Sequence, residues 1–79
     1  MTEKAYLLVD AVKDKADNIL NVLPGQPGIS IVERVDGPPD VVIVAEASEP
    51  LTLARLVIQA MSAIDTLTER IEYLPVRNH

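Results

Sequence analysis

The chain has 79 residues and a mass of 8.6 kDa, with 48% hydrophobic and 24% charged residues, a composition typical of one folded domain. It contains no cysteine, which excludes disulfides and thiolate metal sites. The net charge of −5 disfavours direct binding to the phosphates of nucleic acids. The two aromatic residues, Tyr6 and Tyr73, are too few for a base-stacking surface.

The hydropathy pattern gives no indication of a membrane protein. The longest uninterrupted apolar runs contain about five residues, against about 20 in a membrane-spanning helix, and no apolar signal segment follows Met1. We therefore expect a soluble cytoplasmic protein without a membrane partner.

The first half of the chain predicts a strand, a helix and a second strand. Residues 5–12 (AYLLVDAV) are apolar on both alternating faces apart from Asp10, as in a central strand. Asp14 is expected to cap the helix and Asp17 to occupy its third position, before the stop at 24–28. The helix's apolar positions follow the i, i+3, i+4, i+7 spacing: Ala16, Ile19, Leu20 and Leu23. Residues 29–36 then predict an edge strand protected by its charges.

The second half begins with a turn at 37–39, followed by the strongest strand signal. Residues 41–45 (VVIVA) are mostly β-branched, which indicates a strand buried on both faces. Ser48, with Glu49 and Pro50 in the first turn, predicts a helix start. This helix has a core-facing stripe of Leu53, Val57, Ala60, Met61 and Ile64.

Residues 67–74 predict the last strand. Leu67, Ile71 and Tyr73 fall on one side, Thr68, Arg70 and Glu72 fall on the other, and Pro75 is expected to end the strand.

These elements predict an α+β fold of the ferredoxin-like type, β-α-β-β-α-β. Two βαβ halves joined by a hairpin, each with a right-handed crossover, allow a four-stranded antiparallel sheet of order 4-1-3-2 with both helices on one face. The uncovered face of such a sheet measures roughly 330 Å², comparable with the largest apolar patch that a monomer tolerates. We therefore expect a homodimer in which two sheets pack face to face as a dimeric α/β barrel.

The residues that carry chemistry are few. The one histidine is the terminal His79, and with no cysteine the common nucleophile and base pairs cannot form. No H-x-x-x-H, C-x-x-C or glycine-rich phosphate loop is present. We expect no catalytic residues, no metal site and no cofactor, and hence a protein that is not an enzyme. Asp10, inside an apolar strand, is either a carboxylate with a raised pKa or a structural residue at a strand end.

A family resemblance is carried by the segment 35–43 (VDGPPDVVI), in which Gly37 and Asp40 stand in a turn between two strands. It resembles the Gly-x-Tyr-Asp turn of the effector (RAM) domain of the Lrp/AsnC family of transcriptional regulators. Further matches, in the same order and spacing, extend over nearly the whole chain: Ala5 to Val9, Leu23-Pro24-Gly25, Pro27-Gly28-Ile29 and Thr68-Glu69. The family's helix-turn-helix is absent, so the chain is similar to a stand-alone effector domain.

This resemblance implies that residues 1–79 form a single ligand-binding and oligomerisation domain. It implies a dimer, or a ring of dimers, with a small amino-acid effector bound at an oligomer interface. By position, Gly37 and Asp40 match the turn that lines the effector pocket and Thr68 matches a threonine early in the last strand. The implied role is regulation of transcription through a DNA-binding relative, without direct contact between this chain and nucleic acid.

The same turn has a second interpretation on physical grounds. Asp40 either meets the ammonium group of a ligand or caps the turn by accepting local amide bonds. Arg70 either binds a ligand carboxylate with two hydrogen bonds or is a solvated surface residue.

Three departures from the family pattern bear on the implied ligand site, and those at Pro39 and Arg70 support an assembly domain without a ligand. Pro39 replaces an aromatic residue, Arg70 replaces a common second threonine, and the link at 64–67 is about two residues shorter than the family's. An assembly domain without a ligand is the first alternative, and a small enzyme of the dimeric α/β-barrel type is the second.

Overall fold

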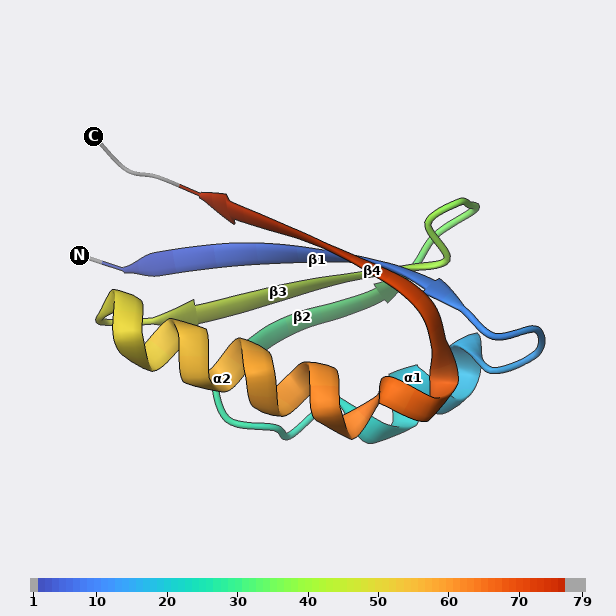
Figure 1. Cartoon of the computed structure of the whole chain (residues 1–79), viewed down its shortest axis with the longest axis horizontal. Helices are drawn as coiled ribbons and strands as arrows, with labels where there is room; N and C mark the ends of the chain where they lie inside the picture. The colour runs from blue at the N-terminus through green and yellow to red at the C-terminus, as the bar shows by residue number, and fades with distance from the viewer. Residues whose placement is uncertain (1, 77–79) are drawn as a thin grey trace.

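The computed structural model describes residues 2–76 and contains two helices on one side of a four-stranded sheet (Figure 1). The elements in chain order are β1 (Glu3–Ala11), α1 (Ala16–Val22), β2 (Ile29–Arg34), β3 (Val41–Ala47), α2 (Pro50–Ala63), the 3₁₀ helix η1 (Asp65–Leu67) and β4 (Thr68–Val76). This is the predicted β-α-β-β-α-β order with one added 3₁₀ turn. His79 lies outside the described residues.

The sheet has the order β2-β3-β1-β4, and each neighbouring pair is antiparallel. Leu7 of β1 lies opposite Ile43 of β3 and Tyr73 of β4. The prediction that the two most apolar strands are central is therefore confirmed, as is the α+β ferredoxin-like fold.

The core lies between the sheet and the helices. Both helices lie beneath the sheet in Figure 1, and the inward positions of β1 (Ala5, Leu7 and Val9) have no exposed surface. The predicted stripe of α2 packs against them: Leu53, Val57, Ala60 and Ile64 are buried and Met61 is half-buried. The helix spacing thus fixes which face of the sheet is covered.

The other face of the sheet carries an apolar patch that no helix covers in Figure 1. Register and alternation place six apolar side chains there, which we term the open-face patch: Tyr6, Leu8, Ile31, Val42, Val44 and Leu74. Tyr6, Ile31 and Leu74 are 38–45% exposed. Val44, flanked by Tyr6 and Ile31, is only 7% exposed yet lies outside the main core cluster. The patch is the apolar remainder that the sequence predicted.

The predicted start of the first helix is wrong at Asp14. This residue has a φ of 66°, a left-handed conformation outside the helix, and Lys15 occupies the cap position without a side-chain cap bond. Asp17 is therefore the second helical residue, not the third, and it pairs with Arg34.

Two further element ends differ from the prediction. Glu49, and not Ser48, occupies the N-cap position of α2, without a side-chain cap bond. Pro50 takes the first helical position, where its missing N–H costs nothing. Pro75 does not end β4, which continues to Val76. β4 is an edge strand, and a proline can point its nitrogen to solvent there. The last two residues of the predicted second strand, Val35 and Asp36, are not part of β2, and Leu67 belongs to η1 and not to β4.

Among the described residues, no helix combines the length and apolar character needed to cross a membrane.

The link between α1 and β2 depends on glycine at two positions with positive φ, Gly25 (93°) and Gly28 (79°). A Cβ at Gly25 would meet open space, whereas one at Gly28 would collide with the Leu56 side chain and lie 3.1 Å from the Glu46 carbonyl oxygen. The Gly28 carbonyl also accepts the N–H of Glu46 at 2.8 Å. Gly28 therefore fixes this link against both β3 and α2.

We expect Gly25→Ala to lower the free energy of unfolding by about 1 kcal/mol, the cost of a left-handed alanine. Gly28→Ala should cost roughly 1–2 kcal/mol more, because a methyl group must also be fitted into a packed contact. Chemical denaturation of both variants gives the difference between their free energies of unfolding. Replacing glycine by alanine changes the entropy of the unfolded chain equally in both variants, so this contribution cancels in the difference. Equal losses in the two variants would contradict the proposed contact.

Candidate functional site

Asp40 fastens the turn before β3 to the end of β1. Its backbone N–H donates to the Val9 carbonyl at 2.8 Å, and its carbonyl accepts the N–H of Val35 at 2.9 Å. Its side-chain Oδ2 accepts the N–H of Ala11 at 2.8 Å. The expected bond to a local amide of the turn is not the one found: the Asp40 side chain accepts an amide 29 residues away, on another strand. These bonds leave the carboxylate charge in place beside the end of the sheet.

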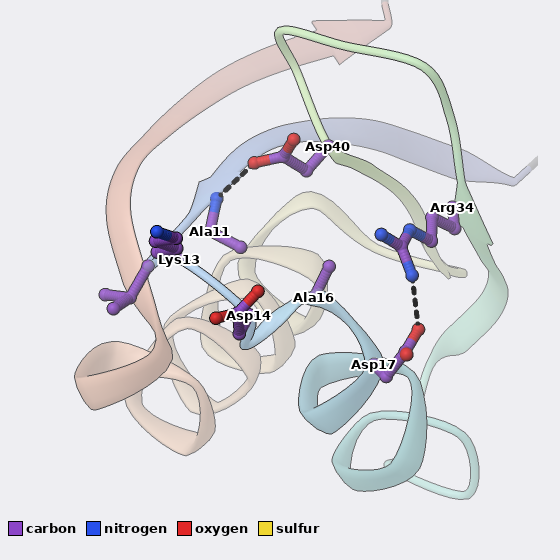
Figure 2. Close-up of a pocket in the computed structure, with 8 residues that line it drawn as sticks. Ala11, Lys13, Asp14, Ala16, Asp17, Arg34 and Asp40 are labelled. Atoms are coloured by element: carbon purple, nitrogen blue, oxygen red, sulfur yellow. Dashed lines mark hydrogen bonds and ion pairs between the residues drawn. The ribbon is translucent and has the colours of Figure 1, made fainter.

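A cavity of about 300 Å³ adjoins Asp40 where β1 passes into α1 (Figure 2). We term it the Asp40 hollow, and it is lined by Ala11, Val12, Lys13, Asp14, Ala16, Asp17, Arg34 and Asp40. In Figure 2 the charged side chains surround the small side chains of Ala11 and Ala16. The volume lies at the lower end of the range for small-molecule sites.

The charged residues of the Asp40 hollow are not equivalent. Arg34 Nη1 donates to Asp17 Oδ1 at 2.7 Å, and these side chains are 59% and 72% exposed, so the pair contributes little to stability. Lys13 and Asp14 are exposed at the start of the link to α1. Both charge signs therefore line one small cavity.

A second hollow of about 170 Å³ lies at the same end of the sheet, at the border of the open-face patch. It is lined by Leu8, Asp10, Pro38, Pro39, Arg70 and Glu72. Arg70 lies opposite Asp10 across the β1–β4 pair. Figure 1 shows the loop between β2 and β3 rising above the sheet on this side. We term it the Arg70 hollow.

The four residues proposed to bind a ligand are spread over this end of the molecule. Asp40 lines the first hollow and Arg70 the second, whereas Gly37 and Thr68 line neither. Thr68 pairs with Ala11, the residue that also binds Asp40, and its hydroxyl donates to the Asp65 carbonyl at 3.3 Å. Asp40 and Thr68 therefore both contact Ala11. The four predicted ligand-binding residues, however, do not surround one cavity.

Lys13 and Asp14 line the Asp40 hollow but were not predicted as site residues. The sequence does contain an indication of them: the charged run 13–15 directly follows a predicted buried strand. Residues that follow a strand lie at the end of the sheet, close to other loops. Within residues 2–76, no group of three or more His, Cys, Asp or Glu side chains is arranged to hold a metal ion.

Sequence comparison finds no matching protein-family model and no matching curated protein. Comparison of structures does find similar folds. PH0061 superposes with a TM-score of 0.84 at 15% identity over 99% of this chain and 53% of its own. TTHA0845 from Thermus thermophilus gives 0.82 at 21% identity over 98% and 95% of the two chains.

Two further structures share the fold. MtbAldR (Rv2779c) gives a TM-score of 0.76 at 12% identity over 100% of this chain and 55% of its own. A protein of Chloroflexus aurantiacus, provisionally designated an antibiotic biosynthesis monooxygenase, gives 0.63 at 17% identity over 100% and 97%. The chain thus spans about half of PH0061 and MtbAldR and nearly all of TTHA0845. It has the fold that the resemblance to an Lrp/AsnC effector domain implies.

The anchoring role of Asp40 predicts a difference between two substitutions. Asp40→Ala removes the acceptor of the Ala11 N–H and should lower the free energy of unfolding by about 1.5–3 kcal/mol. Asp40→Asn keeps an acceptor oxygen and should cost less than about 1.5 kcal/mol. Thermal or chemical denaturation measures both. An alanine variant as stable as the wild type would show that the bond does not hold the turn.

Proposed function

We propose that the chain is a non-catalytic regulatory module of the Lrp/AsnC effector type, which binds a small amino-acid-like effector at an oligomer interface. The Asp40 hollow is the observation that carries this proposal. An amino acid carries an ammonium and a carboxylate group, and the hollow offers a partner for each in a volume of about 300 Å³. Asp40 would accept from the ammonium group, and Lys13 would pair with the carboxylate.

The open-face patch supports the oligomeric part of the proposal. A second copy packed on this face would remove Tyr6, Ile31 and Leu74 from water, side chains that are each 38–45% exposed in the single chain. The Arg70 hollow borders the patch, so a neighbouring subunit on this face would help to enclose it. We propose that Arg70 completes the site from this contact region in a dimer or a ring of dimers, and that Gly37 and Thr68 belong to the site on the ground of the family resemblance alone.

The regulatory part of the proposal needs a partner that contacts DNA. With a net charge of −5, the chain itself is a poor ligand for a phosphate backbone. We propose that it acts through a DNA-binding relative, whose own sheet would pack against the open-face patch of this chain.

The dimer is tested by a charge placed at the centre of the patch. Val44→Arg should convert a species of twice the 8.6 kDa chain mass into a monomer, because the interface would bury an unpaired guanidinium. In the monomer the new side chain can reach water, so folding should persist and is checked by circular dichroism. Gln59→Arg, on the exposed side of α2, is the matched control and should leave the mass unchanged. A dimeric Val44→Arg protein would exclude this face as the interface.

Effector binding is tested by calorimetry with a panel of amino acids. We expect at least one to bind with millimolar to micromolar affinity, about −4 to −8 kcal/mol. Asp40→Asn should weaken that binding by about tenfold or more, since it removes the charge that meets the ammonium group while keeping the bond to Ala11. No heat with any amino acid at millimolar concentration would favour the assembly-only alternative. Unchanged affinity in the variant would remove Asp40 from the site.

The likeness to the Chloroflexus aurantiacus protein favours one second candidate, a small dimeric α/β-barrel enzyme. The chain offers such an enzyme no cysteine and no histidine other than His79, so a reaction would depend on carboxylates, Lys13 or a tyrosine. Recovery of the added amino acid unchanged after long incubation with the protein supports the regulatory module. Its conversion to a product would support the enzyme.

A further inference from the structure

We propose that the Asp40 hollow selects amino acids whose side chain carries a second cationic group, such as lysine, over amino acids with neutral or acidic side chains. This inference rests on the proposed function, because it names the class of effector that the same cavity would take. It is drawn from the charges that line the cavity and from how they are already paired.

The lining contains two cationic and three acidic side chains. Arg34 and Asp17 neutralise each other in the ion pair at 2.7 Å. This is the one ion pair found in the part of the chain that the structure describes. Lys13, Asp14 and Asp40 remain, so one cation faces two carboxylates.

A ligand complementary to these three groups carries one carboxylate and two cations. Its α-carboxylate would pair with Lys13 and its α-ammonium group with Asp40, as in the proposed function. The second cation would then meet Asp14. An amino acid with a neutral side chain would leave Asp14 without a partner, and an acidic side chain would bring a like charge towards two carboxylates.

The hollow also has room for such a side chain. Its apolar wall is formed by Ala11, Val12 and Ala16, and the small methyl side chains of the two alanines leave the cavity open. In Figure 2, Asp40 lies on one side of this wall, and Lys13 and Asp14 lie on the other. The ligand would therefore bridge the end of β1 and the link to α1.

The backbone conformation of Asp14 allows its charge to be removed by substitution without straining the chain. Its φ of 66° belongs to the left-handed region, which asparagine tolerates as readily as aspartate. Asp14→Asn therefore removes the charge while preserving the backbone and nearly the same side-chain shape. Asp36→Asn removes the same charge at an exposed position that lines neither hollow, and it serves as the matched control.

The experiment compares lysine with norleucine, which has the same unbranched chain without the terminal ammonium group, by calorimetry on the wild-type protein. Lysine should bind roughly two- to tenfold more tightly, the size expected of one partly exposed charge pair. The ratio of the affinity for lysine to that for norleucine should fall when the salt concentration is raised from about 20 mM to about 500 mM, because salt screens the charge pair. These two concentrations give Debye lengths of roughly 20 Å and 4 Å. In Asp14→Asn the lysine-to-norleucine ratio should fall to about one, and Asp36→Asn should keep the wild-type ratio.

The possible failures are distinguishable. If norleucine binds as tightly as lysine to the wild type, or if Asp14→Asn keeps the preference for lysine, the selection by charge is wrong while the proposed effector site stands. If neither these two nor any other amino acid binds, the proposed function fails together with the inference. If both bind but Asp36→Asn also loses the preference, the effect comes from net charge and not from the hollow, which overturns the inference.

Discussion

Between their charged ends, the two central strands are apolar on both faces, while both helices lie on one side of the sheet. On the helix side this apolarity forms a core in which Leu7, Val9 and Ile43 are fully buried. On the other side it leaves the open-face patch, where Tyr6 and Leu74 remain 38–40% exposed. A 79-residue chain buries a smaller fraction of its surface than a larger domain does, so covering this patch would add stability that one copy lacks. The open-face patch is thus a consequence of how the strands and helices are arranged.

Asp40 connects this sheet to the proposed effector cavity. Its backbone bonds to Val9 and Val35 and its side-chain bond to Ala11 hold the loop that separates the two hollows. A ligand that engaged the Asp40 carboxylate would act on the same loop that borders the open-face patch. In the proposed function, effector binding and assembly are therefore coupled through one residue, and such coupling must be reciprocal: an effector that favours assembly is bound more tightly by the assembled form.

Much of the fold was predictable because it depends on periodicity. A central strand was predicted from the β-branched run 41–45, and the buried face of the second helix was predicted from the stripe between Leu53 and Ile64. The structure confirms the sheet order and the covered face. The ends of elements were not predictable, because they depend on contacts distant in sequence. Asp14 lies in a left-handed conformation outside α1, and Pro75 is accommodated because β4 is an edge strand.

The site was predictable only in part for the same reason. The turn residue Asp40 was visible in the sequence, but its bond to Ala11 spans 29 residues. The grouping of Lys13 and Arg34 around the same cavity depends on the packing of α1 against β2. Residues from the first link and the second strand thus meet only in the folded chain, and local pattern cannot show this.

The most direct test of a ligand site at this end of the sheet is a titration of the ¹⁵N-labelled protein with lysine, followed through its backbone amide resonances. Ala11 is the most informative position, because its N–H donates to the Asp40 carboxylate. The expected result is that the largest and saturable shifts occur at Ala11, Lys13, Asp14 and Asp40. Shifts that are absent at these residues, or that are confined to the exposed side of α2, would contradict the assignment of the Asp40 hollow as the effector site.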